Sequence, residues 1–130
     1  ALGKRLYLTV GDAIAKNQVP AVAPDTDIKQ VIVEISQKML GVTAVLEGET
    51  ILGVITDGDI RRMLSHYEDI KGLKAKDIMS LHPKTVEAGV LAVDALDLMQ
   101  NHKITQLLVT KEGHYIGVIH LHNLIQEGII

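Results

Sequence analysis

The stretch "ILGVITDGDIRRML" at residues 51–64 has a counterpart, "YIGVIHLHNLIQEG", at residues 115–128, and the second copy begins 64 positions after the first. Each copy joins a β-branched apolar run to a polar corner that opens a helical pattern. Upstream, "VAPDTDIKQVIVEI" from Val22 aligns with "VEAGVLAVDALDLM" from Val86 at the same spacing. Self-similarity at a fixed offset predicts one structural unit present twice.

Both copies predict the same order of elements. Apolar residues recur at helical spacing from Ile28 to Met39, and Asp25 or Thr26 can cap that helix. Two short apolar runs around a polar turn follow, which predicts a hairpin, and a last helix is expected from Asp59 to about His66.

The second copy repeats this order, with a last helix from Leu121 to about Glu127. The predicted fold class is therefore mixed α+β, with two β-α-β-β-α repeats packed pseudo-symmetrically around a groove. We expect a first repeat at residues 9–66, a connector at 67–74 and a second repeat at 75–130, after a lead at 1–8. The segment "VGDAI" from Val10 echoes "AKDIM" from Ala75.

Composition narrows the function classes. The net charge is −3 and the chain has neither Phe nor Trp, so it lacks the basic surface and stacking platform of a nucleic-acid binder. No apolar run approaches the ~20 residues that span a bilayer. The absence of cysteine excludes disulfides and thiolate metal sites and is consistent with a reducing compartment. We expect a cytoplasmic protein with no nucleic-acid or membrane partner.

The corner after the first hairpin has two interpretations. Thr56 and Asp59 have the spacing of a capping box, in which hydroxyl and carboxylate each accept a backbone N–H, and this needs no ligand. The same residue types can also bind a nucleotide: Gly58 allows close backbone approach, Thr56 adds a hydroxyl, and Asp59 can accept ribose hydroxyls. Both interpretations stay open.

Neighbouring charges bear on the ligand interpretation. Arg61 can meet a phosphate or pair with a nearby acid, and both are open. Asp57 opposes a bare phosphate contact, because a second carboxylate repels the anion unless a cation intervenes.

At the second corner the matching residues are His120, His122 and Asn123, so an imidazole replaces the hydroxyl and an amide replaces the acid. Asn123 can cap a helix or bond a hydroxyl without charge. The histidines invite a metal interpretation, but a site needs three or four ligands, so we expect structural or surface histidines and no metal site. The two corners are expected to differ in ligand binding.

These repeats, each with a G-V-I run leading into a turn and helix, resemble a pair of cystathionine-β-synthase (CBS) domains. The segments "ALGKRLYLTVGDAI", "TDGDIRRML" and "IHLHNLIQEGII" resemble the C-terminal CBS pair of bacterial arabinose-5-phosphate isomerases. That resemblance implies a parent chain with a sugar-isomerase domain, which interconverts ribulose 5-phosphate and arabinose 5-phosphate on the route to Kdo and lipopolysaccharide. It implies that this segment is regulatory or assembles the enzyme and is not itself catalytic.

The resemblance also implies partners. CBS pairs that bind adenosyl nucleotides carry a Thr or Ser and an Asp at the positions of Thr56 and Asp59, so a nucleotide effector is expected, either AMP or ATP or the pathway product CMP-Kdo, with no required cofactor. CBS pairs associate through their helices, so a homodimer is expected, to which Met39, Met63, Met79 and Met99 can contribute if they do not fill the core. The alternative is a purely structural dimerisation module without a ligand.

Overall fold

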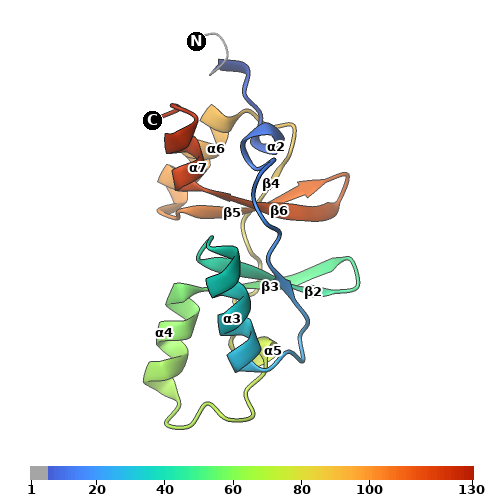
Figure 1. Cartoon of the computed structure of the whole chain (residues 1–130), viewed down its shortest axis with the longest axis vertical. Helices are drawn as coiled ribbons and strands as arrows, with labels where there is room; N and C mark the ends of the chain where they lie inside the picture. Colours follow the sequence, from blue (N-terminus) through green and yellow to red (C-terminus); the bar gives the residue numbers. More distant parts are fainter. Residues whose placement is uncertain (1–5) are drawn as a thin grey trace. The chain divides into compact units, whose positions relative to one another are not determined.

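The computed structural model describes residues 6–130, so the first five residues of the expected lead at 1–8 lie outside the described part. In chain order the elements are α2 (Val10–Ala13), β1 (Ala21–Val22), α3 (Ile28–Lys38), β2 (Val42–Glu47), β3 (Thr50–Thr56), α4 (Asp57–His66), α5 (Ala75–Ile78), β4 (Thr85–Glu87), α6 (Ala92–His102), β5 (Gln106–Lys111), β6 (His114–His120) and α7 (Leu121–Gln126) (Figure 1).

The predicted β-α-β-β-α order is confirmed in both repeats, and the fold class is mixed α+β. Each repeat forms a three-stranded sheet, in the orders β1-β2-β3 and β4-β5-β6. The first pair of strands in each sheet is parallel and the second is antiparallel. Gly53 pairs with Val45 and Gly117 pairs with Val109, in both cases beside a bulge, so the two hairpins have the same register.

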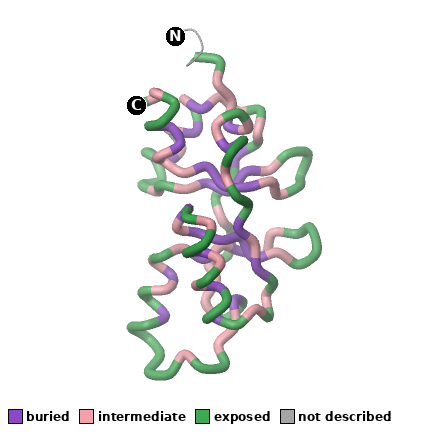
Figure 2. The backbone as a smooth tube through the Cα atoms, in the orientation of Figure 1, coloured by how far each residue is buried: buried purple, intermediate pink, exposed green. Residues whose placement is uncertain are grey.

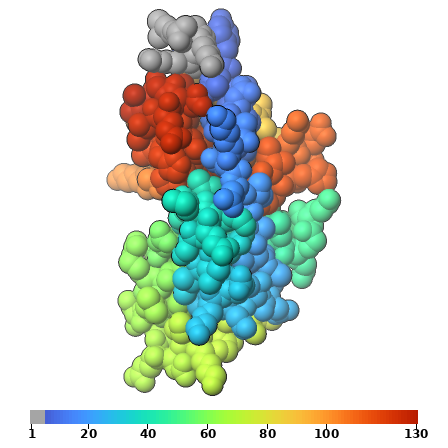
Figure 3. Space-filling view, viewed as in Figure 1, coloured from blue at the N-terminus to red at the C-terminus, as the bar shows by residue number. Residues whose placement is uncertain are grey.

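The chain divides into two compact units. The first-repeat unit comprises residues 20–83, and the second-repeat unit comprises residues 84–130 together with the described N-terminal residues 6–19. In Figure 3 this N-terminal segment, in blue, lies against the red C-terminal residues of the same unit. The compact units therefore divide the chain differently from the sequence repeats, because α2 belongs with the second repeat and α5 with the first.

Equivalent backbone hydrogen bonds hold these two short helices. In the second-repeat unit, Val10 N–H donates to Val90 O (2.8 Å) and Gly11 N–H to Ala88 O (2.9 Å). In the first-repeat unit, the N–H groups of the first two residues of α5, at 75 and 76, donate to the carbonyls of residues 26 and 24, both at 2.9 Å. The echo between "VGDAI" and "AKDIM" thus reflects one structural role.

Each unit has its own core, formed where the helices cover the sheet (Figure 2). In the first-repeat unit the buried residues are Val22, Val31, Ile35, Val45, Ile55 and Ala75. In the second-repeat unit they are Val10, Ile14, Val86, Ala92, Ala95, Met99, Leu107, Val109, Ile119 and Leu124. Residues of α2 or α5 thus complete the apolar layer of the unit to which each helix belongs.

Two helix starts differ from expectation. The N-cap of α3 is Asp27 and makes no side-chain cap bond, whereas Thr26 accepts from the Ala23 N–H and Asp25 pairs with Lys76. Helix α4 begins at Asp57, two residues before the expected start, because the Thr56 side chain caps it.

Candidate functional site

The first corner joins β3 to α4 through a closed hydrogen-bond ring. Thr56 N–H donates to Asp59 Oδ2 (2.9 Å), and Asp59 N–H donates to Thr56 Oγ1 (3.3 Å). This is the capping box that the spacing predicts, so the capping interpretation is confirmed.

Asp59 is buried, with 5% of the residue exposed, and its carboxylate receives further donors. Arg62 Nη2 donates to Oδ1 (2.7 Å), Ser80 Oγ donates to the same oxygen (2.8 Å), and Thr56 Oγ1 donates to Oδ2 (3.2 Å). Burial alone raises the pKa of Asp59, but these hydrogen bonds together hold it below the ordinary value. The carboxylate is therefore ionised at neutral pH.

These bonds limit what Asp59 can do for a ligand. A carboxylate offers about four lone-pair sites, and the bonds from Thr56, Arg62 and Ser80 occupy that number. A ribose hydroxyl that bonds to Asp59 would have to displace one existing donor, and the uncharged side-chain donors are the hydroxyls of Thr56 and Ser80.

The sequence did not reveal two members of this network. Arg62, and not Arg61, pairs with Asp59, and its position one turn after the acid is a signal that could have identified it. Ser80 is 21 positions from Asp59 and carries no local signal. Asp57 is exposed, and within residues 6–130 no carboxylate lies at ion-pair distance from Arg61.

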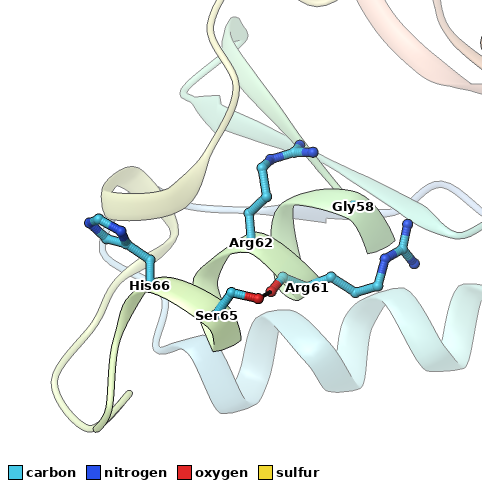
Figure 4. A pocket seen from close by; sticks show the side chains of 5 residues that line it. All are labelled: Gly58, Arg61, Arg62, Ser65 and His66. Carbon is cyan, nitrogen blue, oxygen red and sulfur yellow. Dashed lines mark hydrogen bonds between the residues drawn. The ribbon is translucent and has the colours of Figure 1, made fainter.

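A groove runs along α4 next to this corner (Figure 4). Its volume is about 530 Å³, and it is lined by Gly58, Arg61, Arg62, Ser65 and His66. Ser65 Oγ donates to the Arg61 carbonyl (3.1 Å), which orients the hydroxyl along the helix. The predicted Gly58 and Arg61 thus line one groove, while Thr56 and Asp59 form the cap at its start.

The second corner closes with neutral groups. His120 N–H donates to Asn123 Oδ1 (2.8 Å), and Asn17 and Asn123 exchange two amide hydrogen bonds, of 3.0 and 3.1 Å. Asn17 also donates to the Val118 carbonyl (2.9 Å). Asn17 therefore holds Asn123 as Ser80 holds Asp59, and it too was missed because its partner is 106 positions away.

The two histidines at this corner contact each other. Their rings lie 4.4 Å apart, and His120 Nδ1 accepts the His122 N–H at 3.0 Å. Burial, with the neighbouring His122, lowers the pKa of His120, which favours the neutral ring that this bond requires. Across residues 6–130 there is no group of three or more His, Asp or Glu side chains placed to hold a metal ion.

Sequence comparison identifies relatives of this arrangement. The family model described as the CBS domain matches residues 10–66 and 75–129. The arabinose 5-phosphate isomerase KdsD of Yersinia pestis is 36% identical over 132 residues, which cover 100% of this chain and 40% of the relative. KdsD of Francisella tularensis is 38% identical over 128 residues, covering 97% of this chain and 39% of the relative. The chain thus spans about two fifths of these relatives and corresponds to their CBS region.

Solved structures share the fold at lower identity. The CBS domain NE2398 has a TM-score of 0.84 at 22% identity and covers 94% of this chain and 98% of its own. The CBS domain protein PAE2072 from Pyrobaculum aerophilum, complexed with AMP, has a TM-score of 0.79 at 21% identity, covering 90% of each chain. The CBS domain of a bacterial CNNM/CorC family Mg²⁺ transporter, in complex with ATP, has a TM-score of 0.75 at 18% identity. The match covers 98% of this chain and 92% of the transporter domain's chain. In residues 6–130 of this chain, every helix is too short or too polar to cross a bilayer.

Proposed function

Because the chain belongs to the CBS-domain family, we propose that it is the regulatory CBS pair of an arabinose-5-phosphate isomerase and binds a nucleotide effector. The observation that carries this proposal is the alignment with KdsD over the whole chain, at 36% identity and with only 40% of the relative covered. We place the isomerase chemistry in the remaining part of such a parent enzyme, and both parts in the cytoplasm, on the route to Kdo and lipopolysaccharide.

We propose the first corner as the main effector site. Its support is chemical: Thr56 and Asp59 provide a hydroxyl and a carboxylate, and the adjoining groove carries exposed guanidinium groups. Two structural relatives are complexed with AMP and with ATP, which favours an adenine nucleotide over CMP-Kdo. The second corner, with His120, His122 and Asn123, is proposed as the weaker site because it has no carboxylate to accept ribose hydroxyls.

The proposed signal is a change in the Asp59 network. When a ribose hydroxyl donates to Asp59, Ser80 loses its acceptor, although its backbone still pairs with Val54 through two hydrogen bonds of 2.8 and 3.0 Å. Effector binding would thereby loosen the side-chain tie between α4 and the segment after α5. That segment leads into the second-repeat unit at residue 84, so the change has a covalent route along the chain.

A thermal-shift panel of AMP, ATP, CMP and CMP-Kdo tests the proposal. A ligand that binds only the folded state at 100 times its Kd adds about 2.7 kcal/mol of stability, so one nucleotide should raise the Tm by several degrees. Asp59→Asn should abolish the shift, because the amide keeps an acceptor for the cap but loses the charge. Asn123→Ala is the matched variant at the other corner and should leave most of the shift intact.

The alternative is a dimerisation module without a ligand, and exposed apolar side chains favour it. Leu64 on α4 is 58% exposed, Ile125 on α7 is 56% exposed, and Met39 at the end of α3 is 80% exposed. A protein that responds to none of the four nucleotides, and whose dimer in sedimentation is dissociated by Leu64→Glu or Ile125→Glu, would support this alternative.

A further inference from the structure

The groove on α4 is lined by one stripe of the helix. Gly58, Arg61, Arg62, Ser65 and His66 follow one another at the intervals that place side chains on the same helical face. The eight helical steps from Gly58 to His66 correspond to about 12 Å along the helix axis. The volume of the groove, about 530 Å³, falls within the range of small-molecule sites.

The two arginines of this stripe carry positive charge, and one acid, Asp59, pairs with Arg62. Arg62 shares Asp59 but keeps 72% of its side chain exposed, and within the described residues Arg61 has no ion-pair partner. Asp57, one turn before Arg61, does not line the groove. In Figure 4 both guanidinium groups reach toward the Gly58 end of α4, while His66 projects from the other end.

The fold itself gives no reason for glycine at position 58. Gly58 lies inside α4 and its φ is not positive. A Cβ added there would come no closer than 3.4 Å to another atom, and the nearest atom belongs to the flexible end of Arg62. Glycine destabilises a helix relative to alanine, so the residue lowers stability without relieving a clash. Its effect is to keep the head of the groove open beside the guanidinium groups.

We infer that this groove binds the phosphate chain of the nucleotide effector and prefers a chain of two or three phosphates to a single one; this inference rests on the proposed function. Guanidinium groups match phosphate oxygens in geometry and charge, and Gly58 allows a phosphate to approach the helix closely. A chain is preferred because the residues that line the groove extend over about 12 Å of α4, farther than one phosphate reaches. The first corner therefore distinguishes ATP from AMP.

Titration calorimetry of the full chain with ATP, AMP and sodium tripolyphosphate, in magnesium-free buffer, tests the inference. We expect ATP to bind at least tenfold more tightly than AMP. Arg61→Gln should weaken ATP about tenfold and change AMP less than threefold. Lys111→Gln removes one positive charge from the exposed end of β5 in the other unit and is the matched control that should change neither affinity.

Gly58→Ala provides a second, independent measurement. We expect it to raise the Tm of the free protein, because alanine favours the helix, and to weaken ATP binding, because the methyl group occupies the head of the groove. A loss of ATP binding in this variant thus cannot be attributed to misfolding.

The outcomes separate the two proposals. Equal affinities for ATP and AMP, or an ATP affinity that Arg61→Gln leaves unchanged, would overturn the phosphate-chain assignment while nucleotide binding stands. Absence of binding by both nucleotides would overturn the proposed function. In that case tripolyphosphate tests whether the groove binds a phosphate chain at all. Tripolyphosphate binding that is lost in Arg61→Gln would support the phosphate-chain assignment, and no binding of tripolyphosphate would refute it.

Discussion

At the scale of single residues, Asp59 and Asn123 perform one structural task with different chemistry. Each accepts a backbone N–H that caps its helix, and each is held by a polar side chain that follows a short helix, Ser80 or Asn17. Asp59 also forms an ion pair with Arg62, whereas Asn123 exchanges two amide hydrogen bonds with Asn17. The first corner is therefore charged and the second is neutral, which is why we assign the effector site to the first.

Truncation of the Asp59 side chain should lower the free energy of unfolding. Asp59→Ala removes the carboxylate half of the capping box of α4 and leaves Ser80 and Arg62 without their acceptor, so we expect the free energy of unfolding in urea to fall by about 2–3 kcal/mol. Asp57→Ala, at an exposed acid two residues earlier, is the control and should cost less than about 0.5 kcal/mol. Equal losses in the two variants would contradict the network described for Asp59.

The bond at His120 predicts a pH dependence. In the folded protein the pKa of His120 is lowered by burial and, to a smaller extent, by His122. As the pH falls below the ordinary histidine value of about 6.5, the unfolded chain therefore binds a proton at His120 more readily than the folded protein does. The stability linked to neutral His120 is present above that pH and is lost as pH falls below it.

We expect the wild type to lose up to about 1 kcal/mol, roughly the contribution of one helix cap, relative to His120→Thr between pH 7.5 and 5.5. Threonine is the matched residue of the first corner and caps without titrating. Urea unfolding at both pH values measures the difference, and parallel pH profiles for the two proteins would refute the assignment.

At the scale of elements, α3 and α6 end in the same way. Met39 and Lys103 both adopt the left-handed conformation, with φ of 62° and 55°, directly after the last helical residue. Glycine is favoured at such positions because it has no Cβ to strain. Both helices therefore terminate at a residue that the backbone conformation disfavours.

Met39→Gly is expected to raise the free energy of unfolding by about 0.5–1 kcal/mol, since the left-handed strain is relieved. Met39→Ala removes the side chain but keeps the strain, so it should bring no such gain. If alanine stabilised as much as glycine, the cause would be the exposed methionine side chain and not the backbone.

The order of elements could be predicted because it depends on local patterns. The apolar spacing of residues 28–39 identified α3, and the repeat at a 64-residue offset identified the second copy of each element. The capping box of Thr56 and Asp59 was also predictable, because both partners lie within one turn. Ser80 and Asn17 were not, because a contact between distant segments leaves no periodic signal in the chain.

At the scale of the whole molecule, sequence repeats and compact units divide the chain differently. Helix α2 opens the first sequence repeat, yet Val10 and Ile14 belong to the core of the second-repeat unit. Helix α5 contributes Ala75 to the core of the first-repeat unit. The repeat in the sequence revealed that the two short helices are equivalent, but the unit that each one joins follows from long-range packing.

This arrangement predicts the effect of removing residues 1–19. The second-repeat unit would lose two buried core residues and the backbone bonds to Ala88 and Val90, so hydrogen exchange should show loss of protection in residues 84–130. Residues 20–83 should stay protected, because every element of that unit lies within the range. Loss of protection in 20–83 with 84–130 unchanged would contradict the division into units.

The position of α2 also has a consequence for synthesis on the ribosome. Residues 6–19 are translated before their partners in 84–130, which follow only after the whole contiguous unit 20–83 has been made. At about 5–20 residues per second, α2 waits for roughly 5–20 s until the last strand and helix of its unit exist. Nascent chains should therefore complete the unit of residues 20–83 before the unit that contains α2, because Val10 and Ile14 can enter their core only after residues 84–130 have been made.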